Sequence, residues 1–383
     1  MAWQWTIREQ QLLLQDEKGI VFAPSAKDVY ACASERFSET QLPHASMHHS
    51  PVQDIPGLRL SQLSVSLGLE CSFENDTILL KGYVRKGLRR FPLECPLSQL
   101  NDHIILANTW HYISTGYDEL IALLKKASIR EFGIINLAQY MSLKRNYDTQ
   151  SAVGFIDNAY SRLANHEEDI LSNPPVGLKA TLYPYQETGF KWLSFIADQG
   201  CGCILGDEMG LGKTLQVIAL IASRVQSGKK PSLVIAPVSL LENWRREFEK
   251  FTTGIRLLVH HGSNRTGRFR ELLDYDVIVI SYSTACSDQA ILQMIDWDLV
   301  VLDEAQAIKN PHAIRTVAVK AIKRNAAVAV TGTPFENHVT DLWSLMDFII
   351  PGCLGTLEEF NSEISDDDDG AQRIEPVLSP LML

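Results

Sequence analysis

A glycine-rich segment in the middle of the chain carries the residue types that bind nucleotide phosphates. Gly206 is followed by Asp207 and then, after further glycines, by Lys213 and Thr214, between an apolar run and a helical pattern. In such a loop, backbone N–H groups and the positive end of the helix surround phosphate oxygens, lysine reaches the outer phosphates, and threonine binds Mg²⁺. Asp207 replaces the glycine of the common motif. The strand-loop-helix context still favours a nucleotide site over a turn that binds nothing.

A second, acidic motif follows another apolar run. Leu299–Leu302 is typical of a buried strand, and Asp303, Glu304, Ala305 and Gln306 come directly after it. Ligands of open parallel sheets bind at the carboxyl ends of the strands, so we expect both motifs at one edge. There Asp303 is placed to hold Mg²⁺ through water, and Glu304 to orient and deprotonate an attacking water. Asp303 and Glu304 alone would indicate only a polar loop. Together with the phosphate loop they predict a catalytic site.

Short apolar runs alternate with helical patterns in the second half of the chain. The runs are Cys203–Leu205, Leu233–Ala236, Leu257–Val259, Val277–Ile280, Leu299–Leu302 and Val328–Val330. Runs rich in Val and Ile without polar interruptions are typical of parallel strands buried on both faces. The i, i+4, i+7 spacing of Trp244, Phe248 and Phe251 indicates a helix between two of them and places Trp244 in the core. The predicted fold class is α/β, a mainly parallel sheet flanked by helices.

The first half of the chain has a weaker pattern. Thr77–Val84, Phe91–Leu93 and His103–Ala107 are typical of strands. One helix is expected after Asp118, as its N-cap, and another over Ile134–Leu143.

A short basic segment lies within this first half. Lys81 to Arg90 holds five basic residues and no acid. We favour a charged hairpin or edge strand, protected from aggregation, over a grip for DNA or an acidic partner.

The charge of the chain is unevenly distributed. A net charge of -11 argues at first against a nucleic-acid partner. However, residues 341–383 hold one basic and ten acidic groups, whereas residues 180–340 hold 17 and 16. The acidity is therefore a C-terminal feature, and it says little about the partner of the central region.

Composition bounds the class of protein. With 45% hydrophobic and 21% charged residues the chain is expected to fold, which excludes a disordered or fibrous protein. No apolar run approaches the ~20 residues that cross a bilayer, and the N-terminus lacks a signal pattern. Seven cysteines without a CxxC pair indicate reduced, buried thiols. We expect a protein of the cytoplasm or nucleoid, without a membrane partner.

Six motifs, in order, resemble the first motor lobe of the SWI/SNF-type DNA translocases, helicase-like ATPases of helicase superfamily two. The motifs are Leu182–Gln186 with Gly189 and Trp192, Gly206–Thr214, Ile235–Pro237 with Ser239 and Trp244, Asp303–Gln306, Ile308–Asn310, and Thr331–Pro334 with Asn337 and Asp341–Leu345. The resemblance covers roughly Leu182–Leu383. It implies a RecA-like lobe that uses ATP and Mg²⁺ and contacts the backbone of double-stranded DNA.

The resemblance also implies roles for single residues. The ATP site comprises Gln186, which contacts adenine, with Asp207, Met209, Gly210, Leu211, Gly212, Lys213 and Thr214. Thr214 and Asp303 hold the metal, Glu304 and Lys213 serve catalysis, and Gln306, Thr331 and Thr333 couple hydrolysis to movement. Gln306 replaces the usual histidine, so it keeps a hydrogen bond but cannot titrate. Tyr183 stands where the family often has arginine.

Candidate DNA contacts are backbone-directed and carry no sequence readout. They are Ser239, His261, Arg265, Ser281, Tyr282 and Lys309, each with a solvated loop residue as the alternative. The resemblance favours Ser239 and Lys309. A net charge of +1 over residues 180–340 predicts weak, salt-sensitive binding.

These motifs suggest a division of the chain. Polar residues and Pro174-Pro175 indicate a boundary near residue 170. We expect a smaller accessory α+β domain at 1–170, whose sequence indicates neither its role nor a protein partner. The RecA-like ATP-binding lobe is expected at 171–350 and an acidic inter-lobe segment, truncated, at 351–383.

The second lobe of the family, which supplies arginine fingers worth ~10³ to 10⁵ in rate, has no counterpart before Leu383. We therefore interpret the chain as an N-terminal fragment that binds nucleotide and hydrolyses it poorly. The function expected is the ATP-binding lobe of a double-stranded-DNA-dependent ATPase and translocase. The alternative is a scaffold that binds DNA or protein and has lost ATPase activity.

Overall fold

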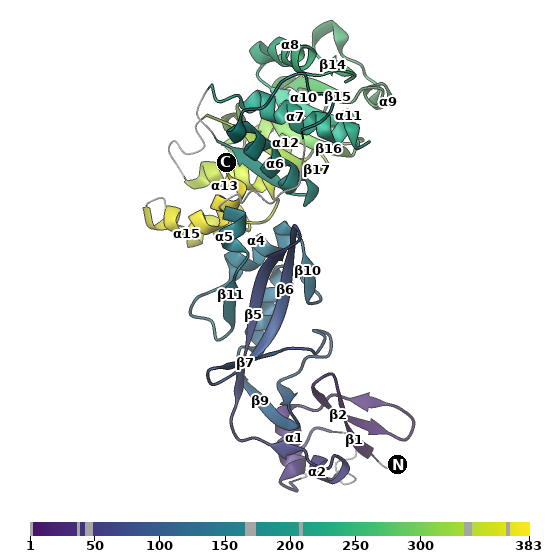
Figure 1. Cartoon of the computed structure of the whole chain (residues 1–383), viewed down its shortest axis with the longest axis vertical. Coiled ribbons are helices and arrows are strands. Elements are labelled where there is room, and N and C mark those ends of the chain that lie inside the picture. The colour runs from purple at the N-terminus through teal and green to yellow at the C-terminus, as the bar shows by residue number, and fades with distance from the viewer. Residues whose placement is uncertain are drawn as a thin grey trace. The chain divides into compact units, whose positions relative to one another are not determined.

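The computed structural model describes residues 3–36, 39–42, 49–164, 174–206, 210–332, 339–364 and 368–383. The chain divides into two compact units, with the elements labelled in Figure 1. Unit 1 comprises Met1–Ile135 and Asn146–Ala159, and unit 2 comprises Asn136–Arg145 and Tyr160–Leu383. The boundary expected near residue 170 falls within residues 165–173, which lie outside the described part. Unit 2 takes up the chain upstream of it, from Tyr160, and also includes residues 136–145.

Unit 1 is built mainly from strands. Its elements are β1 (Trp3–Arg8), β2 (Gln11–Asp16), β3 (Val21–Phe22), α1 (Ala26–Ala33), α2 (Pro51–Asp54), β4 (Arg59–Leu60), β5 (Val65–Glu74), β6 (Thr77–Lys86), β7 (Arg89–Pro92), β8 (His103–Leu106), β9 (Thr109–Thr115), α3 (Tyr117–Lys126), β10 (Gly133–Ile135) and β11 (Gly154–Asp157). One sheet has the order β1-β2-β3, and the larger one follows the path β10-β6-β5-β9-β4. Trp3, Trp5 and Trp110 anchor a buried cluster under the first sheet.

Two predictions about helix starts in this region were wrong. Helix α3 begins at Tyr117, with Gly116 in the left-handed region as its N-cap, so Asp118 lies in the first turn and does not cap it. Ile134 belongs to β10, which pairs with β6, and helix α4 (Leu137–Asn146) starts later. Asn136 explains that start: its side chain accepts from the backbone N of Gln139, whose side chain accepts from the backbone N of Asn136.

The basic segment Lys81–Arg90 forms the charged hairpin that its sequence predicts. Lys86 pairs with Arg89 across a turn that contains Gly87, whose φ is 59°. Strand β7 pairs only with β6 among the described strands, so it is an edge. Its cationic side chains disfavour pairing with a further strand.

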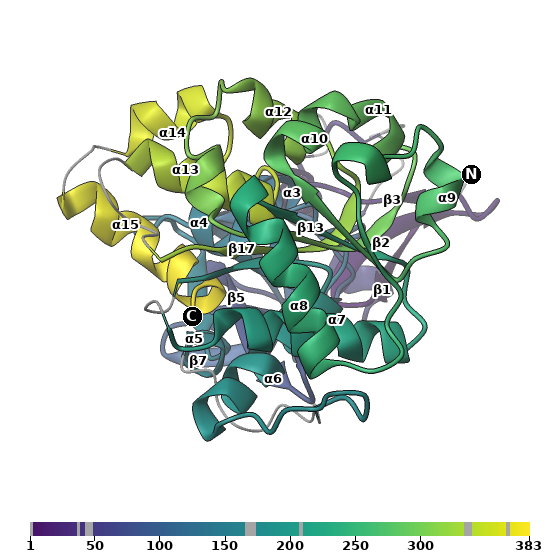
Figure 2. The same ribbon diagram turned by 90° about the horizontal axis from the view of Figure 1, so that it is seen from above.

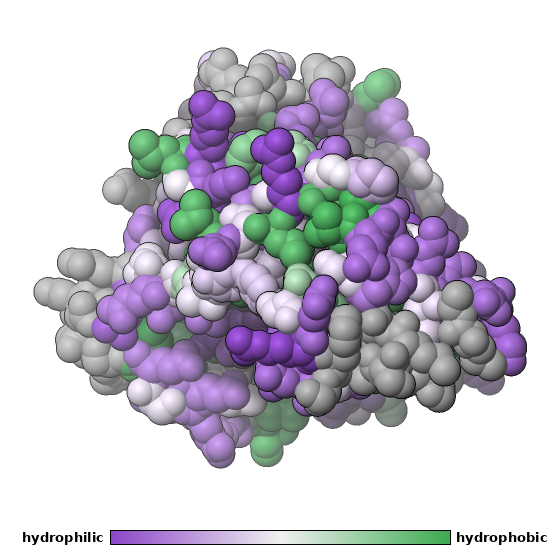
Figure 3. Space-filling view, turned by 90° about the horizontal axis from the view of Figure 1, so that it is seen from below, coloured by the Kyte–Doolittle hydropathy of each residue, from purple (hydrophilic) through white to green (hydrophobic). Residues whose placement is uncertain are grey.

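Some apolar surface of unit 1 stays exposed. Ile7, Ile20, Val21 and Val52 are each more than one third exposed. In the view from below, apolar side chains gather near the centre of the face among polar ones (Figure 3).

Unit 2 contains a six-stranded sheet in which every pairing is parallel. Its strands are β12 (Gly202–Leu205), β13 (Ser232–Ala236), β14 (Leu257–Val259), β15 (Val277–Ser281), β16 (Trp297–Leu302) and β17 (Arg324–Val330), in the order β12-β17-β16-β13-β15-β14. The longer helices are α4, α6 (Pro184–Asp198), α7 (Lys213–Gln226), α8 (Leu241–Phe251), α10 (Tyr282–Ser287), α12 (Ile314–Lys320), α13 (Val339–Ile349), α14 (Leu357–Glu363) and α15 (Asp368–Leu378). The shorter ones are α5 (Tyr160–Ala164), α9 (Phe269–Leu272) and α11 (Gln289–Leu292), with 3₁₀ turns η3 (Val238–Leu240), η4 (Gly262–Asn264), η5 (Ala305–Ile308) and η6 (Ser379–Leu381). All six apolar runs are confirmed as strands.

The sheet of unit 2 forms the middle of three layers. Helices α6, α7 and α8 pack on one face, and α10, α12 and α13 pack on the other (Figure 2). The predicted α/β class is confirmed. Because every strand points the same way, all six carboxyl ends meet at one edge of the sheet.

The last residues of the chain add to the β12 edge of this sheet. Met382 forms a parallel bridge with Ile204, and the backbone N of Leu383 donates to the carbonyl of Ile204 at 3.0 Å. The backbone N of Gly206 donates in turn to the carbonyl of Leu383 at 2.6 Å. The entry into the glycine-rich loop is therefore braced by a segment remote in sequence.

The prediction of reduced thiols is confirmed. All seven cysteines are free thiols, and all but Cys286 are buried. Among the described residues, no helix is long and apolar enough to cross a membrane.

Candidate active site

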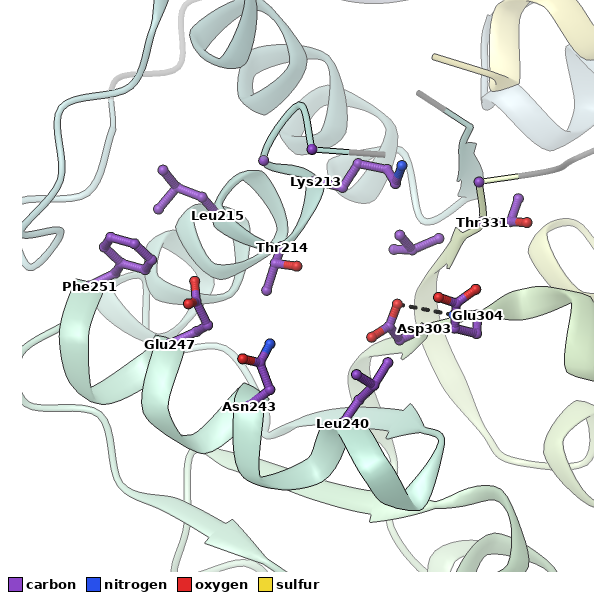
Figure 4. A pocket seen from close by; sticks show the side chains of 14 residues that line it. Lys213, Thr214, Leu215, Leu240, Asn243, Glu247, Phe251, Asp303, Glu304 and Thr331 are labelled. Atoms are coloured by element: carbon purple, nitrogen blue, oxygen red, sulfur yellow. Dashed lines mark hydrogen bonds between the residues drawn. The ribbon is translucent and has the colours of Figure 1, made fainter. Parts of the chain in front are cut away.

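A cavity of about 440 Å³ lies at the carboxyl edge of the unit 2 sheet (Figure 4). Two of its walls are the start of α7 and the end of β16, and helix α8 forms a third. The lining residues are Gly210, Gly212, Lys213, Thr214, Leu215, Leu240, Asn243, Glu247, Phe251, Asp303, Glu304, Val330, Thr331 and Gly332. The two motifs singled out from the sequence thus share one cavity.

Two glycines shape the loop that precedes α7. Gly210 has a φ of 92° and Gly212 a φ of 78°, a region that residues with a side chain rarely adopt. Gly212 is the N-cap of α7, so Lys213 and Thr214 open the helix at its positive end, facing the cavity. Asp207 and Met209, which the resemblance assigns to the same loop, lie outside the described residues.

Gln186 fastens this loop to the start of α6. Its Oε1 accepts from the backbone N of Tyr183 at 3.0 Å, and its Nε2 donates to the carbonyl of Leu211 at 3.1 Å. A Cβ on Gly212 would lie 2.4 Å from this Nε2, so the glycine also permits the close approach of Gln186. These two bonds leave one lone pair of Oε1 and one N–H of Nε2 for the expected contact with adenine.

Helices α6 and α7 also touch through a buried amide. A Cβ on Gly189 would lie 2.1 Å from Oε1 of Gln216, which is fully buried. Neither amide atom of Gln216 has a hydrogen-bond partner among the described residues. The small residue at 189 is therefore needed for the two helices to pack.

Asp303 is held on several sides at the end of β16. Its Oδ2 accepts from Nε1 of Trp244 at 2.8 Å, its Oδ1 accepts from the backbone N of Glu304 at 3.0 Å, and its backbone N donates to the carbonyl of Ile235 at 2.8 Å. Burial raises the pKa of the Asp303 carboxyl above its ordinary value, and the charge of Glu304 raises it further, whereas the Trp244 hydrogen bond and Lys213 oppose the rise. A cation in the cavity would restore the charged form.

Glu304 sits in a strained backbone conformation and is tied to its neighbours. Its φ is 51°, in the left-handed region, which is uncommon for a residue with a side chain and recurs at functional sites. Nε2 of Gln306 donates to Oε2 of Glu304 at 2.5 Å, and Oγ1 of Thr331 donates to Oε1 of Gln306 at 3.2 Å. Gln306 therefore bridges Glu304 and the end of β17. Thr333 lies outside the described residues.

Two of the residues predicted to contact DNA have buried side chains whose hydroxyls are bonded within the lobe. Ser281 is buried, and its hydroxyl accepts from the backbone N of Thr284 as the N-cap of α10. Tyr282 is also buried, and its hydroxyl donates to the carbonyl of Asp303 at 2.9 Å. Burial raises the pKa of Tyr282 far above its usual range. Both hydroxyls are used inside the lobe, where they shape loops at the strand ends.

The remaining DNA candidates differ in their exposure. Ser239 is exposed on η3, directly after β13. The Arg265 guanidinium is paired with Asp288 and partly exposed, and Lys309 Nζ lies 3.9 Å from Asp341 with a largely buried side chain. His261 is half-buried in the loop that leads to η4. Ser239 and Arg265 are thus the predicted contacts whose residues are exposed.

Helix α8 contributes groups that the sequence argument missed. Asn243, Glu247 and Phe251 line the cavity opposite Thr214 and Leu215 (Figure 4). Their spacing of four residues is the one signal that would have placed them on a single helical face.

The role of Trp244 was predicted only in part. The apolar spacing of α8 predicted a core residue, which is confirmed, but it carried no sign of the bond from its indole N–H to Asp303. Polar use of a buried aromatic depends on the partner that the fold brings to it.

The family comparison agrees with this geometry. The model of the SNF2-related domain matches residues 185–383, about half of the chain. The chain belongs to the SNF2-related family. The match covers the part of the chain in which the six motifs resemble the SWI/SNF-type translocases.

Individual relatives of this SNF2-related chain match the same half. It is 38% identical over 216 residues to the "putative ATP-dependent helicase/translocase YwqA" of Bacillus subtilis, covering 54% of the chain and 23% of the relative. It is 40% identical over 206 residues to the "TATA-binding protein-associated factor MOT1" of Saccharomyces cerevisiae, covering 50% of the chain and 11% of the relative. The chain thus spans a quarter or less of the length of these curated relatives.

A solved structure matches unit 2 in three dimensions. The "Sulfolobus solfataricus SWI2/SNF2 ATPase core in complex with dsDNA" superposes with a TM-score of 0.52 at 40% sequence identity. The match covers 56% of this chain and 46% of that chain. The matched part of the chain therefore has the fold of about half of that SWI2/SNF2 ATPase core.

Proposed function

We propose that this SNF2-related chain supplies the first motor lobe of a double-stranded-DNA-dependent ATPase that moves along duplex DNA. One observation carries the proposal: the phosphate-loop residues Lys213 and Thr214 line the same cavity as Asp303 and Glu304. ATP is hydrolysed there to ADP and phosphate when a second lobe closes on it. The enzyme works in the cytoplasm, on the nucleoid if the source is bacterial.

Binding of ATP follows from the loop geometry. The backbone N–H groups of Gly210–Thr214 and the N-terminal end of α7 surround the phosphates, together with Asp207 and Met209 of the same loop. The Lys213 ammonium contacts the outer phosphates. Gln186 reads adenine with the hydrogen-bonding capacity that Tyr183 and Leu211 leave open.

The site also fits a magnesium ion. Thr214 and Asp303 present oxygen atoms to one cavity, and hard divalent cations prefer oxygen ligands. When bound, Mg²⁺ neutralises phosphate charge and favours the transfer. Asp303 would hold the ion through its carboxylate, in part through water, and Thr214 through its hydroxyl.

Glu304 is the residue that orients and deprotonates the attacking water. The bond from Gln306 holds its carboxylate, and Thr331 holds Gln306 in turn. Thr333, in the same motif as Thr331, is proposed to complete this connection. A shift at the end of β17 would thereby move the carboxylate of Glu304, the proposed general base. Because glutamine cannot titrate, the residue at position 306 keeps the same hydrogen-bonding groups at every pH.

Duplex DNA is contacted at the backbone, by Ser239 first and by His261, Arg265 and Lys309 around it. Support comes from the exposure of Ser239 and from a structural relative described as a complex with dsDNA. Arg265 and Lys309 would exchange Asp288 and Asp341 for phosphate groups. Binding through so few charges is weak, and salt weakens it further.

The domain roles follow from the same proposal. Residues 171–350 form the RecA-like lobe, residues 351–383 lead toward the second lobe, and residues 1–170 form an accessory α+β domain.

The test compares ATP binding with ATP hydrolysis in the protein that contains this chain. Lys213→Ala should abolish ATP binding, whereas Glu304→Gln should bind ATP but lose hydrolysis. Wild-type hydrolysis should rise when duplex DNA is added. Full activity in Lys213→Ala, or no stimulation by duplex, would contradict the motor function and favour a scaffold that binds DNA or protein.

A further inference from the structure

An indole hydrogen bond helps to orient the Asp303 carboxylate, which lines the cavity. Trp244 is 1% exposed, and its Nε1 donates to Oδ2 of Asp303 at 2.8 Å. Oδ1 of the same carboxylate is held by the backbone N of Glu304. Each oxygen thus has one fixed donor, which sets the direction of its remaining lone pair. Partners of this kind orient metal ligands and strongly affect metal affinity.

The helix that carries Trp244 begins directly after the exposed turn that holds Ser239. The backbone N of Leu240 donates to the carbonyl of Pro237 at 2.9 Å, which closes the turn, and α8 starts at Leu241. One helical turn later Trp244 reaches Asp303.

The strand before this turn is bonded to the same aspartate. The carbonyl of Ile235 in β13 accepts from the backbone N of Asp303 at 2.8 Å. Asp303 is therefore joined to the strand-turn-helix segment both before and after Ser239. Movement of this segment cannot leave the carboxylate unaffected.

We propose that Trp244 is a positioning residue that orients Asp303 for the metal and couples the Ser239 turn to the ATP site. Contact of duplex DNA with the turn then changes the affinity for magnesium and ATP. By linkage, magnesium and ATP change the affinity for DNA by the same factor. This inference rests on the proposed function and deepens it, because it names a route between the two sites.

Replacing Trp244 by phenylalanine separates the hydrogen bond from the packing. Trp244→Phe keeps an aromatic ring beside Phe248, whose centroid lies 6.1 Å away, but removes the donor to Asp303. Trp297→Phe is the matched control. Trp297 is also 1% exposed, and its Nε1 donates to the carbonyl of Leu292 at 3.0 Å, at the start of β16 and away from the cavity.

The first experiment measures calorimetrically the affinity of the 383-residue chain for a non-hydrolysable ATP analogue, with excess Mg²⁺ and with EDTA. With Mg²⁺, Trp244→Phe should weaken the affinity roughly 10- to 100-fold. In EDTA it should leave the affinity unchanged, and Trp297→Phe should change neither. An unchanged affinity with Mg²⁺, or an equal loss in EDTA, would overturn the positioning role, since the second result indicates packing alone.

The second experiment measures the ratio of analogue affinities with and without saturating duplex DNA, in low salt with Mg²⁺. The wild-type ratio should differ from one, and Trp244→Phe and Ser239→Ala should each bring it to about one. Combining both changes should have no further effect. A wild-type ratio of one, or a ratio preserved in Trp244→Phe, would overturn the coupling.

Failure of the proposed function itself would look different. A wild-type chain that binds neither the analogue nor duplex DNA contradicts the ATP and DNA sites regardless of Trp244.

Discussion

Alanine at Gly212 should damage the phosphate loop through two separable effects. The backbone there has a φ of 78°, and holding an L-residue in the left-handed region costs about 1–2 kcal/mol. The new Cβ would also lie 2.4 Å from Nε2 of Gln186. The amide must then leave the carbonyl of Leu211, and a hydrogen bond of this kind contributes about 1 kcal/mol. We expect Gly212→Ala to lose about 2–3 kcal/mol of unfolding free energy from these two terms.

Gly210 offers a control in the same loop. Its φ is 92°, but a Cβ there would meet no described atom within 4 Å. Gly210→Ala should therefore show the backbone cost alone. Adding Gln186→Ala to Gly212→Ala removes the clash, so the two changes should cost less together than the sum of their separate effects.

The assay is thermal and urea unfolding with and without the ATP analogue. Only the transition of the unit that binds the analogue shifts upward with it, which identifies the signal of unit 2 in a chain of two units. Analogue affinity should fall with stability in Gly212→Ala. Equal losses in Gly210→Ala and Gly212→Ala, together with additive behaviour of Gln186→Ala, would refute the role assigned to the Gln186 contact.

Three further changes test other parts of unit 2. Because burial raises the pKa of Asp303, magnesium-dependent nucleotide binding should fall on acidification at a higher pH than for an ordinary aspartate. The stability that the protonated carboxyl contributes is lost as pH rises through that pKa. Calorimetry across pH checks the binding, and the profile of an ordinary aspartate would contradict the prediction. Gln216→Met should raise the unfolding free energy by about 1 kcal/mol, because the buried amide has no partner among the described residues; a lower melting temperature would argue against this. Asp298→Asn should lower the unfolding free energy by about 3–5 kcal/mol, because the buried Arg224 guanidinium loses its bidentate partner. Urea unfolding measures the loss, and a change below about 1 kcal/mol would show that Asp198 alone is a sufficient partner for Arg224.

The parts of the fold that could be predicted are those that a local pattern determines. Runs such as Val277–Ile280 became strands because a parallel strand covered on both faces must be apolar along its whole length. Helix starts were less accessible. At α3 the choice between Gly116 and Asp118 depends on backbone conformation, which side-chain type alone does not reveal.

The same distinction between predictable and unpredictable features applies to the candidate site. Lys213, Thr214, Asp303 and Glu304 could be placed at one edge because parallel strands align their carboxyl ends. The direction of Tyr282 could not, since a residue after a strand can face either the solvent or the neighbouring loop.

The pairing order of the unit 2 sheet has a consequence for biosynthesis. Strand β12 leads into the phosphate loop, yet its sheet neighbour is β17, so Gly202 meets Ala327. A ribosome must therefore finish nearly the whole lobe before the loop gains its support, and such long-range closure is slow. The proposed nucleotide site therefore forms late, after β17 and the Leu383 that accepts from Gly206 have been synthesised.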